Sequence, residues 1–169
     1  MRKTAIFISL LFLFACNKGM WVTKNAYRPK HPKFSIPKEP FKANELINNH
    51  LLYVSTKKFV NYDGSVVIGY MGFYSDGRMI IDNTWEKEMS QTLNERNSFN
   101  TASSIGYYTT NGNTIKMEYF LPGDGGRYET REGIIKKDTI ILIEKIPQPL
   151  RKEIRSDTLV KSSYPLQDN

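Results

Sequence analysis

The sequence has one cysteine, Cys16, and two histidines, His31 and His50, among its 169 residues. A lone cysteine excludes an internal disulfide and the paired-cysteine motifs of redox and zinc proteins. Neither histidine has a partner at the spacing of metal ligands or of a catalytic triad. The motifs G-x-S-x-G and H-E-x-x-H are also absent. We therefore expect no metal, no cofactor and no enzymatic activity.

Long hydrophobic runs are missing too, since the one extended apolar stretch covers only Ala5 to Ala15. A membrane-spanning helix needs about 20 apolar residues, so this stretch is too short to cross a bilayer. It follows the basic residues Arg2 and Lys3 and ends at a small residue, which is the pattern of a secretory signal peptide. We expect residues 1–15 to be this signal peptide and to be removed.

The stretch Leu13-Phe14-Ala15-Cys16 resembles the lipobox of bacterial lipoproteins, in which a small residue precedes an invariant cysteine. The resemblance implies that the Cys16 thiol carries diacylglycerol, that the chain is cut before it, and that the new amino terminus is acylated. Each buried CH₂ of an acyl chain contributes about 0.8 kcal/mol, so two or three chains give a durable membrane anchor. The alternative is an ordinary secretory signal, or an uncleaved signal anchor, beside a chance cysteine.

Prolines and lysines dominate residues 16–45. Proline removes a backbone donor and favours extended neighbours, so this segment predicts a disordered, lipidated tether. Its seven basic residues face only Glu39 and Glu45. A basic residue near an anionic leaflet contributes about 1 kcal/mol, so the tether either lies along lipid headgroups or is a solvated linker.

The net charge of the chain lies mainly in this tether. The formal net charge is +7, and removal of Arg2 and Lys3 leaves +5, which the tether carries by itself. The remaining chain is therefore near neutral. A nucleic-acid surface needs a basic patch on the folded domain, so we expect no nucleic-acid partner.

Residues 46–165 predict one all-β domain, followed by a tail at 166–169. Short runs rich in β-branched and aromatic residues are separated by turn pairs such as Asp76-Gly77 and Asn111-Gly112. Such regular punctuation is typical of a sandwich or barrel. We expect an antiparallel meander that closes into a small lipocalin-like barrel, with a bend or bulge at Gly69 or Gly72.

The Asn111-Gly112 pair predicts a type I′ hairpin, because both loop positions need positive φ. Side chains on one strand alternate between faces, so the register decides which residues share the core face. The expected pairs on that face are Tyr108 with Ile115, Gly106 with Met117, and Ser104 with Tyr119.

One connection has a different periodicity. Trp85, Met89 and Leu93 have the spacing of one helix face, which predicts a short amphipathic helix over residues 84–95. Asn83, with a glutamate three residues later, resembles a capping box. This helix either plugs one end of the barrel or acts as a mobile lid over a binding mouth.

Glu129 and Glu132 are the carboxylates most nearly paired in sequence. Residues three apart on a strand lie on opposite faces, so they cannot act together. We expect them to be surface charges alternating with Arg127 and Arg131.

Three stretches in chain order, GFYSDGRMI, IGYYTTNGNTIKMEYF and YETREGIIKKDTIILIE, are similar to small lipocalin-like lipoproteins of the Bacteroidetes type. The resemblance covers roughly residues 50–146. It implies a lipocalin-like barrel on an outer-membrane lipoprotein of the cell envelope. Within that family, the lack of acidic residues after Cys16 implies a periplasm-facing protein.

Two classes of function remain. The first is a binding module whose barrel holds a small apolar ligand. The candidate lining residues are Tyr70, Tyr108, Ile115, Met117 and Tyr119, with Tyr74 as a further candidate. The second is a structural or protein-interaction lipoprotein whose barrel is filled by its own side chains and which contacts another envelope protein. Eight-stranded barrels can be either, and an enclosed cavity above about 300 Å³ would favour the ligand.

Overall fold

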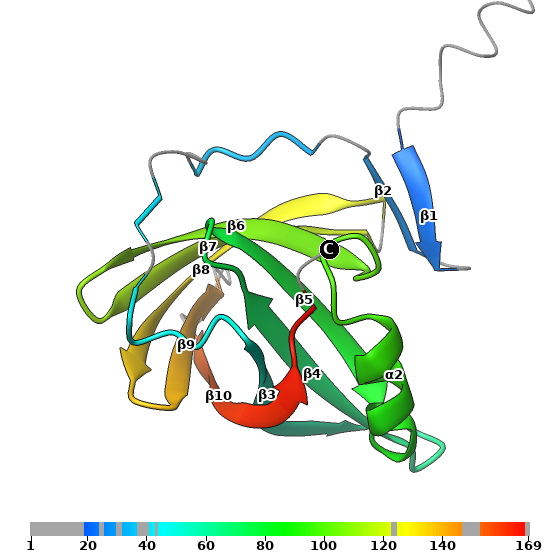
Figure 1. Ribbon diagram of the computed structural model, residues 1–169. Coiled ribbons are helices and arrows are strands. Elements are labelled where there is room, and N and C mark those ends of the chain that lie inside the picture. The colour runs from blue at the N-terminus through cyan, green and yellow to red at the C-terminus, as the bar shows by residue number, and fades with distance from the viewer. Residues whose placement is uncertain are drawn as a thin grey trace, which may run out of the picture.

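The structure is a computed structural model that describes residues 19–23, 26–29, 32–36, 41–42, 44–122, 125–146 and 153–167 (Figure 1). Cys16 and the signal peptide predicted over residues 1–15 lie outside these ranges. Within them, no helix has both the length and the apolar character that a membrane span requires.

Eight strands form a closed antiparallel barrel in the order β10-β3-β4-β5-β6-β7-β8-β9 (Figure 1). Each strand pairs with its neighbour in sequence, and β10 closes the ring by pairing with β3 as well as β9. The strands are β3 (Leu51–Val60), β4 (Val66–Phe73), β5 (Arg78–Trp85), β6 (Ser104–Asn111), β7 (Thr114–Leu121), β8 (Arg127–Lys136), β9 (Thr139–Ile146) and β10 (Glu153–Pro165). The all-β barrel with one short helix is confirmed.

The strand register sorts the side chains into an inner and an outer face. Paired residues share a face, and the face alternates along each strand. One face carries a buried cluster drawn from all eight strands, which only the interior of a closed barrel can hold. The cluster includes Tyr53, Met71, Phe73, Met79, Tyr108, Ile115, Met117, Tyr119, Ile135, Ile140, Leu142 and Leu159.

The hairpin between β6 and β7 turns one residue later than predicted. Asn111 pairs with Thr114, so the loop is Gly112 and Asn113. Gly112 has a φ of 57°, whereas among the described non-glycine residues only Lys137 has positive φ. Positive φ at the first loop residue alone, with glycine there, is the pattern of a type II′ turn rather than type I′.

This shift moves the strand pairing by two residues. Tyr108 pairs with Met117, and Gly106 pairs with Tyr119. The predicted pairs were therefore wrong. Because side chains alternate with a period of two, the predicted inner face, including Ile115, is nevertheless correct.

A second buried cluster lies on the outer face of β3 to β6. The 3₁₀ turn η1 (Glu86–Glu88) and the helix α2 (Met89–Glu95) run along this wall. Leu93 of α2 is buried in the outer cluster. The predicted helix exists, but it covers the side of the barrel instead of plugging an end or closing a mouth (Figure 1). Its cap is also different, since Trp85 precedes η1 without a side-chain cap bond, so the capping box at Asn83 was wrong.

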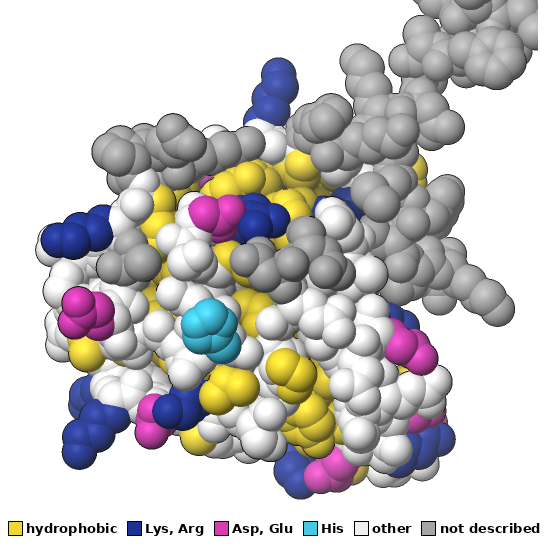
Figure 2. Space-filling view, in the orientation of Figure 1, with side chains coloured by type: hydrophobic (Ala, Val, Ile, Leu, Met, Phe, Trp, Pro, Cys, Tyr) yellow, Lys and Arg dark blue, Asp and Glu magenta, His cyan; other side chains and the backbone are white. Residues whose placement is uncertain are grey.

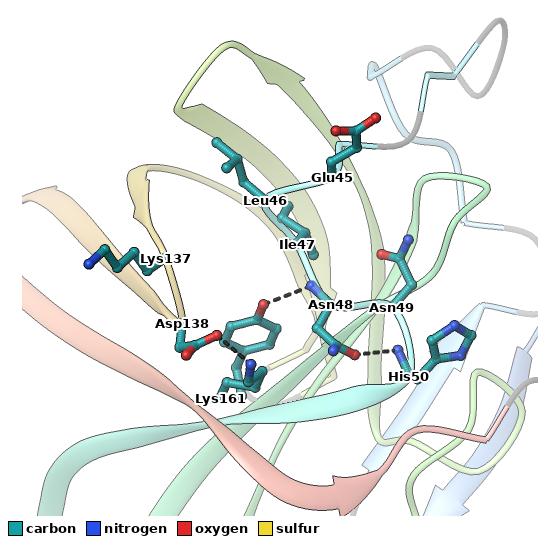
Figure 3. A pocket seen from close by; sticks show the side chains of 10 residues that line it. Glu45, Leu46, Ile47, Asn48, Asn49, His50, Lys137, Asp138 and Lys161 are labelled. Carbon is teal, nitrogen blue, oxygen red and sulfur yellow. Dashed lines mark hydrogen bonds and ion pairs between the residues drawn. The ribbon is translucent and has the colours of Figure 1, made fainter.

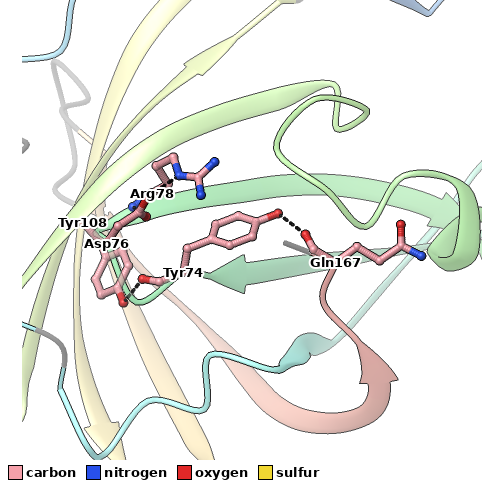
Figure 4. A network of polar contacts seen from close by, with 5 residues as sticks. All are labelled: Tyr74, Asp76, Arg78, Tyr108 and Gln167. Carbon is pink, nitrogen blue, oxygen red and sulfur yellow. Dashed lines mark hydrogen bonds and ion pairs between the residues drawn. The ribbon is translucent and has the colours of Figure 1, made fainter. Parts of the chain in front are cut away.

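The chain after β10 packs over the same outer wall. A Cβ on Gly72 would lie 2.5 Å from Leu166, so glycine is needed there for Leu166 to reach the wall. The hydroxyl of Tyr74 donates to the carbonyl oxygen of Gln167 at 3.0 Å (Figure 4). Residues 166 and 167 of the predicted tail are therefore part of the fold.

The described parts of residues 16–45 differ from an unpacked spacer. Strand β1 (Gly19–Thr23) pairs with β2 (Ala26–Pro29), and the buried Arg28 donates to the carbonyl oxygen of Phe99 at 3.2 Å. Further on, Phe34 packs edge-on against Tyr107, with ring centroids 5.2 Å apart. Proline restricts the backbone, but apolar side chains between the prolines, such as Phe34 and Ile36, still pack on the barrel wall.

Residues 41–42 and 44–50 cross one end of the barrel, which we call the capped end. Phe41 lies over the β4–β5 turn, where a Cβ on Gly77 would be 2.8 Å from its ring. The side-chain amide of Asn44 donates to the carbonyl oxygen of Gly112 at 2.8 Å, in the β6–β7 turn. Ile47 then enters the inner cluster. The segment, and not α2, closes an end of the barrel.

Candidate functional site

Four of the five predicted lining residues point into the barrel and are at most 1% exposed: Tyr108, Ile115, Met117 and Tyr119. The fifth, Tyr70, lies on the outer face, where its hydroxyl donates to the carbonyl oxygen of Arg96 at 3.2 Å. Tyr74 also belongs to the outer cluster. The structure therefore separates the predicted residues into an inner group and an outer group that cannot line one cavity together.

The half of the interior next to the capped end is filled by its own side chains. The hydroxyl of Tyr108 donates to the carbonyl oxygen of Tyr74 at 2.7 Å (Figure 4), and its ring lies 4.9 Å from that of Phe41. A Cβ on Gly106 would lie 2.2 Å from the carbonyl oxygen of Glu118. These contacts show tight packing around the residues that were expected to contact an apolar ligand.

The inner face becomes polar towards the opposite end. Four residues at that end pair with members of the buried cluster, so they face inward as well. Gly69 and its partner Asn83 face inward because Gly69 lies two residues from Met71 on β4. We call the following set the polar end: Ser55, Gly69, Asn83, Glu129, Arg131 and Asp157.

Two hydrogen-bonded groups occupy the polar end. The hydroxyl of Tyr119 donates to Oε2 of Glu129 at 3.0 Å, and Arg131 places Nη2 at 3.9 Å from the same oxygen. On the other side, the hydroxyl of Ser55 donates to Oδ1 of Asp157 at 2.7 Å. Charges of both signs thus face the barrel interior.

Solvent reaches this part of the interior. The side chains of Arg131 and Glu129 are 22% and 24% exposed, although their register partners Met117 and Tyr119 are fully buried. β8 pairs with β9 only from Glu132 to Lys136, so Glu129 and Arg131 lie on the part of β8 that has no partner on that side, away from the capped end. Among the described residues, these two inward side chains are therefore accessible to solvent at the end opposite the capped end, which we call the accessible end.

Gly69 is an inward position of this end where a small side chain would meet only ordinary contacts. A Cβ on Gly69 would have no atom nearer than 3.8 Å, whereas one on Gly133 would be 2.8 Å from a backbone oxygen. The register of β3 shifts between Val54 and Lys58, opposite Gly69. The irregularity predicted at the glycines of β4 therefore lies on the neighbouring strand.

Aromatic side chains stand at the rim of this end. Phe59 pairs with Val67, which pairs with Trp85, so the three form an inward-facing row across β3, β4 and β5. Phe59 is 61% exposed and Trp85 is 37% exposed. The row places two aromatic side chains directly beside the polar end.

The placement of the β8 charges corrects the prediction made for them. Glu129 and Glu132 do lie on opposite faces, because Glu129 pairs with the inward Tyr119 and Glu132 with the outward Lys116. Glu129, however, faces the interior rather than the outer surface. The sequence does contain a signal for this orientation, because Glu129 lies an even number of residues before Ile135, a core residue of the same strand.

A shallow hollow of about 400 Å³ lies over the capped end (Figure 3). Its wall includes Tyr53, whose hydroxyl accepts the N–H of Asn48 at 2.9 Å, and an ion pair between Lys161 and Asp138. The hydrogen bond to Asp138 raises the pKa of Lys161. Two of the charged side chains that line this hollow are thus paired with each other.

Neither the hollow nor the rest of the described chain brings together three His, Cys, Asp or Glu side chains that could hold a metal ion. On the face shown in Figure 2, basic and acidic side chains are interspersed among the described residues and form no patch of one sign.

Comparisons of this chain with protein-family models, with characterised proteins and with solved structures gave no match.

Proposed function

We propose that this chain is a binding protein of the bacterial cell envelope, anchored through acyl chains on Cys16, that takes one small polar ligand at the polar end of its barrel. The observation that carries the proposal is the Glu129–Arg131 pair, which faces the barrel interior yet stays partly open to solvent. Charged side chains rarely face inward, because their desolvation is costly, so a charged pair at this position favours a role in binding.

The structure favours a polar ligand over the apolar ligand expected from the sequence. The apolar half of the interior is packed, and an eight-stranded barrel has room for at most one small ligand. The accessible half presents a guanidinium, two carboxylates and a hydroxyl, from Arg131, Glu129, Asp157 and Ser55. Such convergent polar groups orient a ligand.

The membrane anchor remains part of the proposal. Cys16 lies three residues before β1, and the chain that follows is held on the barrel through Arg28. A lipid on Cys16 would therefore keep the barrel close to the membrane surface. The lipobox resemblance supports an outer-membrane lipoprotein facing the periplasm. Metabolic labelling with a fatty-acid analogue tests this, because label that persists after Cys16→Ser would contradict the anchor.

A second candidate function is contact with another envelope protein. The β3–β4 hairpin carries three exposed apolar or aromatic side chains, Phe59, Val60 and Tyr62, at 61%, 69% and 112% exposure. Exposed apolar clusters of this kind mark interaction surfaces. Loss of a co-purifying envelope protein on changing Val60 and Tyr62 to serine would favour this function.

Ligand binding is tested by thermal shift of the chain that follows the signal peptide, screened against a library of polar metabolites. A ligand that prefers the folded state raises the melting temperature by mass action. We expect at least one hit that disappears in Gly69→Trp, because the new side chain would occupy the space above β4. Hits that Gly69→Trp leaves unchanged would place binding elsewhere, and a library without hits would contradict the proposal.

A further inference from the structure

We infer that the ligand of the polar end is a neutral saccharide, with one sugar ring lying over Gly69 beside Trp85. This inference rests on the proposed binding function and names its ligand class. Three features carry it: the absence of a side chain at Gly69, two polar groups that have no partner among the described residues, and the row of aromatic side chains beside the polar end.

The backbone conformation at position 69 does not require glycine. Gly69 is absent from the described glycines with positive φ, so its backbone conformation is open to any residue. A Cβ there would meet only Ser55 and a carbonyl oxygen of Asp82, at 3.8 and 3.9 Å. Glycine at this position therefore leaves the inner face of β4 without a side chain between β3 and β5, and we place the ligand in this opening.

Polar groups on both sides of this opening are available to a ligand. Asn83 pairs with Gly69 on β5 and is exposed, and its side-chain amide has no hydrogen-bond partner among the described residues. Asp157 uses Oδ1 to accept from Ser55, while its Oδ2 accepts from no described group. One side of the opening thus offers an acceptor, and the other offers both a donor and an acceptor.

The charges select among ligand classes. Glu129 and Asp157 would repel an anion, and Arg131 would repel a cation. An apolar ligand would remove all three charges from water without replacing their hydrogen bonds. A sugar hydroxyl both donates and accepts, so a neutral polyol can bond to carboxylate, guanidinium and amide groups at the same time.

The aromatic row supplies the surface that a sugar ring needs. Neighbouring strands lie about 4.8 Å apart, so the backbones of Phe59 and Trp85, which flank Val67, are roughly 10 Å apart. A sugar ring bound there would lie over Val67, with an aromatic side chain on the strand at either side. The C–H face of a sugar ring is apolar, and aromatic faces bury such surfaces well.

The test uses isothermal titration calorimetry on the whole chain after the signal peptide. The probes are the neutral trisaccharides maltotriose, cellotriose and chitotriose, with citrate, spermidine and laurate as an anion, a cation and an apolar-tailed comparison. The variants are Gly69→Trp, Trp85→Ala and Asn83→Leu. Tyr62→Ala is the matched control, because Tyr62 is a fully exposed aromatic residue on the β3–β4 turn. Circular dichroism confirms that each variant is folded.

We expect at least one trisaccharide to bind and each site variant to raise its Kd by about tenfold or more, which corresponds to about 1.4 kcal/mol. Tyr62→Ala should leave the Kd within about twofold. Saccharide binding that ignores all three site variants would overturn the placement. If only a comparison ligand binds, and Gly69→Trp blocks it, the saccharide is wrong while the proposed binding function stands. If no probe and no library compound binds, both fail.

Discussion

Oε2 of Glu118 accepts the backbone N–H of Ile36 at 2.8 Å, which joins the N-terminal segment to the outer face of β7. The same oxygen accepts the backbone N–H of Ser35 at 2.6 Å and its hydroxyl at 2.9 Å. Glu118 is only 7% exposed. Hydrogen bonds to a charged acceptor are stronger than neutral ones, so this carboxylate is the main polar attachment of the segment.

Removing the Glu118 carboxylate should release residues 32–36 from the barrel wall. Glu118→Ala leaves two backbone N–H groups without their acceptor, which costs about 1–3 kcal/mol. We expect trypsin to cut faster after Lys33 and Lys42, measured by mass spectrometry of a digestion time course. Lys116→Ala, on the same face of β7, is the control. Equal cleavage rates in Glu118→Ala and the control would show that the carboxylate does not hold the segment.

The inner face of β7 can be tested by truncation. Met117 is fully buried and inward, whereas Lys116 is exposed and outward. Met117→Ala should lower the free energy of unfolding by about 2–5 kcal/mol, because it leaves a cavity in the core. Lys116→Ala should change it by no more than about 0.5 kcal/mol. Urea denaturation measures both, and similar small losses would contradict the assigned inner face.

Two inward glycines should respond differently to alanine. In Gly106→Ala the new Cβ would lie 2.2 Å from the carbonyl oxygen of Glu118, so β6 and β7 must separate. We expect a loss of at least about 3 kcal/mol in unfolding free energy, or no folded protein. Gly69→Ala meets no close atom and should cost less than about 0.5 kcal/mol. A large loss in Gly69→Ala would show that the space above β4 is already filled.

The sequence predicted the barrel well because its strands alternate with turns that have few alternatives. Turn residues do not always fix the register, as the Asn111-Gly112-Asn113 stretch shows. Asn-Gly suits a type I′ turn, which was the turn predicted, but Gly-Asn suits a type II′ turn, so the stretch is compatible with two registers. The structure takes the second. Both registers keep Met117 on the inner face, which explains why the core could be predicted although the pairs could not.

The face of Tyr70 could not be predicted, because both faces of β4 are apolar. The outer face is buried under α2 and the C-terminal residues, which periodicity within β4 cannot reveal. The local sequence pattern also failed to predict that Glu129 and Arg131 face inward, since alternating charges on a strand resemble a solvated face. Only closure of the barrel, which depends on β10 pairing with β3, turns that face inward.

Buried tyrosines should make the barrel sensitive to alkaline pH. Burial raises the pKa of Tyr70 and of Tyr108 above the ordinary value of 10.0. Above about pH 10 the unfolded chain therefore loses protons that the folded chain keeps, so stability falls by about 1.4 kcal/mol per pH unit for each tyrosine. Tyr70→Phe should cost about 1 kcal/mol at pH 7, through loss of the bond to Arg96, and should remove one of these two contributions. Urea denaturation between pH 7 and about pH 11 should thus show the variant losing its disadvantage as the pH rises. A difference between wild type and Tyr70→Phe that stays constant over this range would contradict the burial of the Tyr70 hydroxyl under α2.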